Sequence, residues 1–564
     1  MHPRPGSALH SSLLLVLCAV GLNNIGLFQE LLTLRVSPCS HPGTMPREAA
    51  IIGGAAAAMA SSGTVCSLGA AVFWFLWRVW RGRGAVPRAS WEMPLLGHAM
   101  MYRRDPVGFL RRQLAATEGQ VVTLNLAGLE TVVIADQVAA RQFATAPAAK
   151  LSIRAAVNEF GFGVGLGVLN VCLGTGVHVH ALKSQLYPKL NARGVAGLSA
   201  ATKAAVAQYM PMPPRGTAAS CDWVPTMRRV FLHVSMTLFA GPAVLAEAGP
   251  DFIERYIAFQ DQLEDAIAKG VVLPRWLAES AVLGPVARVR SELVEALCPA
   301  VEAEWARAGE ADCPGMWTQA IRKLRKDANP GWRDYCADSA GAAGGGEYTA
   351  AEAAELILGL LFAAHKNPGI AAAQTALFLI DPSADPRHLE GVLEEVDQFG
   401  DEGDGLSPAQ LSDRLPRLER AVYEALRLTA HTIGAIRKVL APSGWTFSTS
   451  SGCTYKVPSG TFVAASHIAP HLDPQNFDRP DVFDPERFAS EAGGRPGEYV
   501  LTTFSNGLHR CPGERLAVAT ITVALTTILG QYLLELPSPL PPLCFERATL
   551  AQRLGKVAVR YRSR

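Results

Sequence analysis

Two apolar stretches open the chain, and they differ in length and in the charge of the segments after them. The first, residues 13–28, is interrupted by two asparagines and is short for a bilayer crossing, so we interpret residues 1–48 as a leader that targets the chain or forms an amphipathic helix. The second, residues 49–77, has no charged residue and exceeds the roughly 20 apolar residues that a transmembrane helix needs. Arginines come directly after it, which predicts a single anchor with the downstream chain in the cytosol. The alternative is a buried helix rich in Ala and Gly.

A short link and a hairpin come after the predicted anchor. Residues 78–97 are basic and contain two prolines, which predicts a stiff tether. β-Branched runs at residues 121–126 and 131–135 flank a turn at Gly128, and they predict two strands.

The rest of the chain predicts a helical body. Helical patterns dominate from about residue 138 to about residue 430, and short strands return between Trp445 and Ala465. Residues 337–346 consist mainly of Gly and Ala and predict a loop that buries no core. We therefore expect residues 98–564 to form one mainly α catalytic domain with small sheets at one edge.

Charge and cysteine usage exclude some classes of protein. Lys and Arg number 52 against 50 Asp and Glu, a balance that gives no reason to expect nucleic acid as a partner. The 11 cysteines are scattered, and no two stand in a CxxC pair. This spacing argues against a disulfide framework and a zinc site, and it fits a reducing compartment.

One cysteine stands in a loop suited to hold a metal. Residues 504–513 read FSNGLHRCPG and precede a long apolar helix. Free N–H groups and the dipole at the head of that helix would stabilise a thiolate at Cys511, and Pro512 is tolerated in the first turn of a helix. Gly507 allows tight backbone where a flat macrocycle approaches, and Phe504 offers an apolar wall beside the sulfur.

This loop resembles the heme-binding segment of the cytochrome P450 family, Phe-x-x-Gly-x-(Arg/His)-x-Cys-x-Gly, at every fixed position. The resemblance implies that heme b is the cofactor, that the Cys511 thiolate is the axial iron ligand, and that Phe504 and Gly507 line the cofactor. His509 stands where sterol 14α-demethylases also carry His, which contacts a heme propionate there. It also implies a fold, a helical prism with small β-sheets.

Three further segments match the family in the expected order. Glu424 and Arg427 form the Glu-x-x-Arg of its K helix, and at this spacing the two side chains can pair. Residues 485–488 read PERF, whose arginine joins that ion pair in the family. Between them stands Arg437, where family members often bind a heme propionate, a role that suits paired guanidinium donors.

The predicted distal helix, residues 349–380, departs from the family. Most monooxygenase members carry an acid and then a threonine at the oxygen-binding stretch, whereas Lys366 and Asn367 occupy those places here. Pro368 lies inside the predicted helix and leaves the carbonyl of Ala364 without its N–H donor. His365 could relay protons because the ordinary pKa of histidine lies near neutrality. We therefore expect His365 and Asn367 to act in catalysis.

The resemblance leaves three functions open. Asn at the threonine position resembles prostacyclin synthase and the cholesterol 7α-hydroxylase group, whereas the cysteine loop resembles sterol 14α-demethylase. The first function is a monooxygenase that oxidises a sterol or another hydrophobic lipid with dioxygen. The second is a lipid peroxide isomerase or dehydratase, which needs neither dioxygen nor a reductase. The third is a heme-binding protein without catalysis.

The family also implies partners and a location. A monooxygenase of this kind receives electrons that originate in NADPH from a flavoprotein reductase, which docks near the cysteine loop. With the anchor predicted at residues 49–77, we expect a single-pass protein of the endoplasmic reticulum that draws its apolar substrate from the bilayer.

Overall fold

The computed structural model describes residues 86–93, 96–117, 120–173, 192–270, 273, 275–307, 349–400, 406–489, 496–546 and 550–564. These all belong to one compact unit, Gly84–Arg564. The predicted leader, the predicted anchor, the first part of the tether and the loop at residues 337–346 lie outside the described residues.

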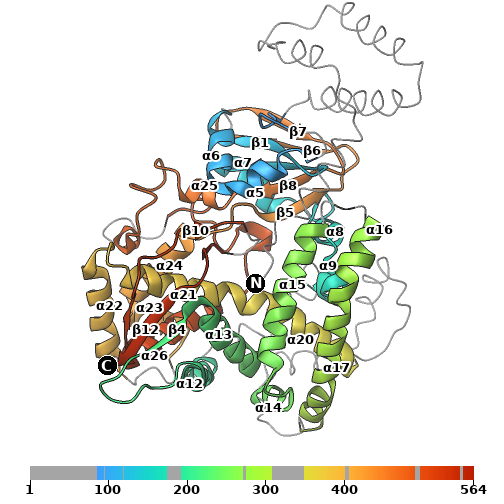
Figure 1. Ribbon diagram of the computed structural model, residues 1–564. Helices are drawn as coiled ribbons and strands as arrows, with labels where there is room; N and C mark the ends of the chain where they lie inside the picture. The colour runs from blue at the N-terminus through green and yellow to red at the C-terminus, as the bar shows by residue number, and fades with distance from the viewer. Residues whose placement is uncertain are drawn as a thin grey trace, which may run out of the picture. The chain divides into compact units, whose positions relative to one another are not determined.

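The largest sheet has five strands in the order β1-β2-β8-β5-β3. Three of them, β1, β8 and β5, are labelled in Figure 1. The strands of this sheet are β1 (Val121–Leu126), β2 (Leu129–Ile134), β3 (Leu151–Ser152), β5 (Gly434–Val439) and β8 (Phe462–Ala465). The first two are antiparallel, and Ala127 and Gly128 both have positive φ, as a two-residue hairpin turn requires. This confirms the predicted hairpin, although the second strand begins two residues earlier than expected.

Three small sheets complete the β structure. The strands are β4 (Ala219–Asp222), β12 (Ala558–Ser563) and β9 (Tyr532–Glu535) in one sheet, the hairpin β6 (Trp445–Ser448) and β7 (Thr454–Val457), and the pair β10 (Leu543–Cys544) and β11 (Gln552–Arg553). Strands β6, β7 and β8 fall where the sequence predicted them, between Trp445 and Ala465.

Helices make up most of the body, as predicted. The longer ones are α12 (Ala192–Tyr209), α13 (Trp223–Phe239), α15 (Phe252–Gly270), α17 (Gly284–Arg307), α20 (Ala350–Ala364), α21 (Lys366–Ile380), α22 (Pro386–Phe399), α24 (Pro416–Leu428) and α26 (Glu514–Gln531). Short helices connect them: α5 (Ala99–Arg104), α6 (Pro106–Ala115), α7 (Gln137–Thr145), α8 (Ile153–Glu159), α9 (Phe162–Gly165), α10 (Val168–Leu173), α14 (Pro242–Glu247), α16 (Arg275–Leu277), the π-helical η1 (Ala278–Leu283), α23 (Pro408–Arg414), α25 (Ile468–His471), and the 3₁₀ turns η2 (Pro485–Phe488) and η4 (Gly507–His509).

The main apolar core lies between α12, α13, α21, α24 and α26. Close approach of α13 and α21 depends on Gly369, where an added Cβ would lie 3.3 Å from Cβ of Phe231. Trp223 on α13 is fully buried and donates from its ring nitrogen to the carbonyl of Ala373 at 3.1 Å. The C-terminal half of the distal helix is therefore held firmly in the core.

The distal helix is divided in two. The sequence predicted one helix over residues 349–380, but α20 ends at Ala364, His365 has φ −110°, and α21 begins at Lys366. Pro368 explains the division, because it has no N–H for the carbonyl of Ala364. Within the described residues, Ala350–Ile380 is the one helical stretch long and apolar enough to cross a bilayer. Within it, 67% of an apolar 18-residue window is buried in the protein, as expected of a core helix.

Candidate functional site

A buried ion cluster fixes the chain beside the cysteine loop. Arg427 and Glu424 on α24 are both fully buried and lie 2.7 Å apart from Nε to Oε2. Arg487 in η2 donates to the second oxygen of Glu424 at 3.0 Å. Arg427 also donates to the carbonyls of His471 and Pro480 at 2.6 and 2.7 Å. The predicted three-residue cluster therefore forms, and it ties helix α24 to the segment that precedes the cysteine loop.

The cysteine loop closes on itself before the helix begins. The backbone N–H of Cys511 donates to the carbonyl of Phe504 at 2.8 Å, and the side chain of Cys511 is exposed. Helix α26 begins at Glu514 with Gly513 as its N-cap, so Pro512 precedes the cap and does not stand in the first turn as the sequence predicted. The backbone N–H of Cys511 is used in the loop closure with Phe504, so the helical hydrogen bonds start later than the sequence predicted.

Local charges favour an anion at the head of α26. Glu514 lies in the first turn, where its own negative charge would oppose a thiolate, but Arg510 holds it at 2.8 Å. The N–H groups at the head of α26 can therefore stabilise a thiolate at Cys511.

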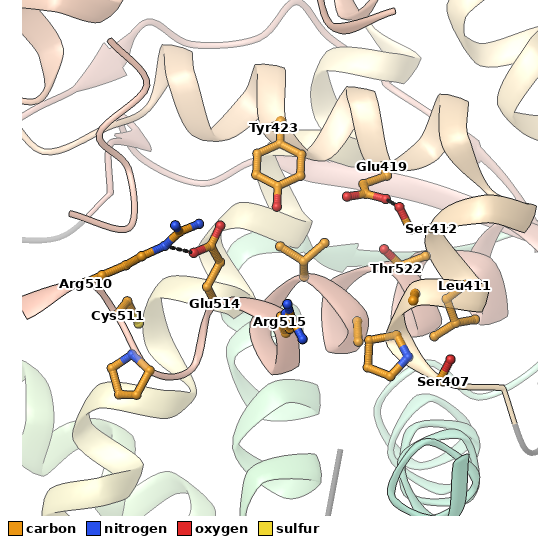
Figure 2. A pocket seen from close by; sticks show the side chains of 15 residues that line it. Ser407, Leu411, Ser412, Glu419, Tyr423, Arg510, Cys511, Glu514, Arg515 and Thr522 are labelled. Atoms are coloured by element: carbon orange, nitrogen blue, oxygen red, sulfur yellow. Dashed lines mark hydrogen bonds and ion pairs between the residues drawn. The ribbon is translucent and has the colours of Figure 1, made fainter. Parts of the chain in front are cut away.

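A pocket of about 810 Å³ opens beside Cys511 between α23, α24 and α26 (Figure 2). Figure 2 shows Cys511 and the Arg510–Glu514 pair at one end and Tyr423 above the pocket. Phe504 packs edge-on against Tyr423 with ring centroids 6.5 Å apart. Phe504 is therefore an apolar wall near the loop, and it is partly buried against the main core.

Arg437 is an uncommon buried cation. It lies on β5 and is fully buried; Nη1 donates to the carbonyl of Phe143, and the guanidinium lies 4.2 Å from the centroid of the Phe143 ring. Its Nε and Nη2 have no hydrogen-bond partner among the described residues. Burial lowers the pKa of Arg437 to about 10. Such a cation is costly unless an anion joins it.

Helix α7 brings Arg437 and the cysteine loop together. Phe143 near its end contacts Arg437, and the next residue, Ala144, lies against Gly507. Gly507 has φ +67°, and an added Cβ would lie 2.7 Å from the carbonyl oxygen of Ala144, so only glycine fits. His509 is half-buried in the same turn, η4. The structure thus gathers Cys511, Gly507, His509 and Arg437 around the end of α7.

The carbonyls exposed by the break in the distal helix receive side-chain donors. Gln260 on α15 donates to the carbonyl of Phe362 at 3.3 Å. Ser235 on α13 donates to the carbonyl of Ala364 at 3.5 Å, which gives a weak substitute for the missing N–H of Pro368. The break is therefore part of the packed structure.

His365 lies at this break, and its environment differs from the one expected. It is fully buried, its Nδ1 lies 2.7 Å from the carbonyl of Leu361, and its ring packs edge-on against Tyr256. Burial lowers the pKa of His365 to about 3. The imidazole is thus neutral at physiological pH, so a relay through it would have to use a neutral ring and not the near-neutral pKa that the sequence suggested.

Asn367 has a fixed orientation. Its Oδ1 accepts the backbone N–H of Leu550 at 3.3 Å, which turns Nδ2 the other way. Asn367 is half-buried, and Ala363, one turn earlier on the same face of the distal helix, is exposed. Asn367 therefore offers N–H donors on the open face of the helix.

Sequence reasoning missed the partners of Lys366. This residue is 1% exposed, and its Nζ lies 2.9 Å from Asp261 and 2.6 Å from Glu264, both on α15. Arg228 on α13 holds Asp261 through two hydrogen bonds of 2.9 and 3.0 Å. A lysine in a stretch otherwise without charges was a signal that a buried acid lies opposite, but nothing in the sequence shows which one.

Comparisons with known proteins agree with the loop and the ion cluster. Residues 318–559 match the family model described as Cytochrome P450. The chain is 30% identical to a sterol 14-demethylase of Arabidopsis thaliana over 223 residues, which are 39% of this chain and 44% of that protein. It is 29% identical to an obtusifoliol 14-alpha demethylase of Triticum aestivum over 222 residues, 39% of this chain and 48% of that protein. The chain thus spans less than half the length of these relatives.

Proposed function

We propose that the chain, of which residues 318–559 match the cytochrome P450 family model, is a heme-thiolate monooxygenase that oxidises a sterol or another apolar lipid. The observation that carries the proposal is the grouping of two residues around the end of α7. One is Cys511, which is exposed at the head of a helix, and the other is Arg437, which is buried and has two nitrogens without a hydrogen-bond partner among the described residues. Arg437 contacts Phe143 of α7 directly. A cysteine thiolate is one of the axial ligands that proteins offer to heme iron, and a buried cation can pair with a propionate arm.

The residues fit heme. Cys511 would supply the thiolate, and the two unpartnered nitrogens of Arg437 would bind a propionate, which removes the cost of a buried cation. His509, half-buried in η4, would contact a propionate as the family resemblance implies. When bound, thiolate-ligated heme supplies the activation of dioxygen for insertion into a C–H bond.

The chain's own contribution on the distal side is hydrogen bonding. Because Leu550 fixes the amide of Asn367, this side chain would donate to an oxygen atom on the open face of the helix. A threonine could both donate and accept, whereas this oriented amide, whose oxygen is used by Leu550, only donates toward the open face. Asn367 would therefore orient an oxygen-bearing group, and the proton itself must come from another residue or from water.

The second candidate is a lipid peroxide isomerase of the prostacyclin synthase type. One observation favours it: between Glu355 and Thr375 no residue is Asp, Glu, Ser or Thr, so the helix itself offers no acid–alcohol pair. An amide that only donates would also suit a peroxide oxygen. A third possibility is a heme-binding protein that catalyses no reaction.

One experiment separates these functions. Purified protein is incubated with sterols and fatty acids together with NADPH and a microsomal flavoprotein reductase, and separately with fatty-acid hydroperoxides alone. A monooxygenase gives a hydroxylated product only in the first incubation, and omission of NADPH abolishes it. Product from hydroperoxide without NADPH supports the isomerase, and binding of heme without product in either incubation leaves the third function.

The reductase and the membrane belong to the same proposal. Electrons would arrive from an NADPH-dependent flavoprotein reductase that docks on the face containing the pocket beside Cys511, where Arg510 and Arg515 offer cations. Residues 49–77 would anchor the chain once in the endoplasmic reticulum, with the catalytic domain in the cytosol. The anchor is tested by extraction with alkaline carbonate, which should leave the full chain in the membrane pellet and release a chain lacking residues 1–85.

A further inference from the structure

Helix α15 contacts the distal helix through one polar side chain in each of three successive turns. Tyr256 donates to the carbonyl of Leu358 at 2.7 Å, and Gln260 donates to the carbonyl of Phe362 at 3.3 Å. One turn further along both helices, Lys366 donates to Glu264 at 2.6 Å. The spacing of four residues on each helix repeats twice, so α15 runs along the distal helix up to its break.

The last of these contacts belongs to a cluster of four charges, which we call the polar cluster: Arg228, Asp261, Glu264 and Lys366. It holds two cations and two carboxylates, so its charges balance. Lys366 and Arg228 are 1% and 8% exposed, whereas Glu264 is 13% and Asp261 is 35% exposed. The polar cluster thus extends from solvent at Asp261 to the buried break in the distal helix.

Several buried polar atoms in and beside the polar cluster have no hydrogen-bond partner among the described residues. The described residues offer no partner to four buried side-chain atoms: Arg228 Nε, Gln260 Oε1, Glu264 Oε1 and His365 Nε2. When His365 donates from Nδ1 to Leu361, its Nε2 is an acceptor, so three of the four atoms are acceptors. Buried polar atoms in folded proteins are paired with protein or with ordered water, and water, with two protons to donate, suits a group of acceptors.

Proton supply is what the proposed reaction still lacks. A monooxygenase places one oxygen atom of O₂ in the substrate and reduces the other to water with two electrons and two protons. The electrons come from NADPH, but the amide of Asn367 does not titrate and therefore supplies no protons.

We propose that the polar cluster is the proton entry to the distal side, with Glu264 carrying protons from solvent at Asp261, through water, to the helix break beside Asn367. Glu264, a carboxylate in the resting polar cluster, takes up a proton from solvent and passes it inward, so it returns to a carboxylate and no charge accumulates. Lys366, which occupies the place of the usual acid, holds Glu264 against the break. The inference rests on the proposed function, because only a monooxygenase needs these protons. Proton delivery itself can be tested without substrate or reductase.

The test is the reoxidation of chemically reduced protein. Heme-loaded protein is reduced with dithionite and mixed with oxygenated buffer, and the return of the oxidised Soret band is monitored by stopped flow. In this reaction the iron loses one electron to O₂, which takes up one proton and leaves as hydroperoxyl, so the rate depends on proton supply. Glu264→Gln keeps an oxygen to accept from Lys366 but cannot carry a proton, and we expect reoxidation to slow at least about tenfold.

Asp265→Asn is the matched control, because Asp265 is the exposed neighbour of Glu264 on α15. It should reoxidise at the wild-type rate. A heme-independent readout, the unfolding transition of each heme-free variant, checks that both variants fold. If Glu264→Gln does not fold, Lys366→Met gives the second measurement, with the same slowing expected.

Equal reoxidation rates in the wild type, Glu264→Gln and Lys366→Met overturn the proton entry and leave the proposed monooxygenase untouched. Slowed reoxidation in a protein that oxidises no lipid with NADPH supports the proton entry while the proposed function fails. A protein that binds no heme overturns both.

Discussion

At the scale of single residues, Arg437 indicates a binding site because two of its buried nitrogens have no hydrogen-bond partner among the described residues. A guanidinium with two nitrogens unpaired in the interior destabilises the protein by about 1–3 kcal/mol for each unsatisfied donor. The sequence could name Arg437 only through its place after the Glu-x-x-Arg segment. Its burial and its free donors became visible once β5 and α7 were placed together.

Replacement of Arg437 by Met should therefore have opposite effects on the two forms of the protein. Without heme, Arg437→Met should leave the free energy of unfolding unchanged or higher, because an uncompensated buried cation is removed. With heme, transfer of heme to an excess of apomyoglobin should be at least about tenfold faster, since one propionate loses a charge-assisted hydrogen bond.

Lys438→Met provides the control from the same strand. Lys438 points to the partly exposed Glu159 and should affect neither measurement by much. Unchanged heme transfer in Arg437→Met would show that Arg437 does not bind the cofactor.

At the scale of elements, the ion cluster on α24 contributes to stability, in contrast to Arg437. Arg427 is fully buried, and its donors meet Glu424 and backbone carbonyls of His471 and Pro480. Removal of one partner from such a cluster leaves the others buried and unpaired.

Arg427→Leu should lower the free energy of unfolding by about 3–5 kcal/mol, measured by urea denaturation. Arg420 on the same helix is the comparison, since it pairs with Glu486, which is 55% exposed. Arg420→Leu should cost at most about 1 kcal/mol. A similar cost for both substitutions would mean that the buried cluster has no special role in holding α24.

The elements also show what the sequence could and could not supply. The hairpin at Gly128 and the strands from Trp445 to Ala465 were predictable from local patterns, because alternation and turn residues act over a few positions. The break at His365 was harder to place: Pro368 indicated a missing N–H, but the donors that compensate for it come from Ser235 and Gln260 on other helices. Contacts of that kind depend on the packing of α13 and α15 against the distal helix, and no sequence pattern near His365 predicts them.

At the scale of the whole molecule, buried histidines make stability depend on pH. Burial lowers the pKa of His365 and of His467 to about 3, and it lowers the pKa of His471 well below its usual value. All three are deeply buried, and His471 and His467 both contact Thr502. In the unfolded chain each would titrate near pH 6.5.

The unfolded state therefore binds more protons than the folded state below about pH 6.5, and stability should fall as the pH falls. This contribution is complete above the unfolded pKa and is lost progressively toward the folded values. These three histidines should contribute up to about three protons to the uptake on unfolding, measured by urea denaturation between pH 7 and 5.

His467→Gln keeps a group that can bond to Thr502 but does not titrate in this range. It should reduce that uptake by about one proton. A free energy of unfolding that is constant from pH 7 to 5 in the wild type would contradict the burial of neutral histidines.

The central claim is that Cys511 is the axial ligand of the iron, and the absorption spectrum of the reduced protein with carbon monoxide tests it most directly. The wild type should show the red-shifted Soret band of thiolate-ligated heme. Cys511→Ser should lose that band, whereas Cys544→Ser, at a cysteine on β10 away from the loop, should keep it. A thiolate-type band that survives in Cys511→Ser would show that another residue ligates the iron.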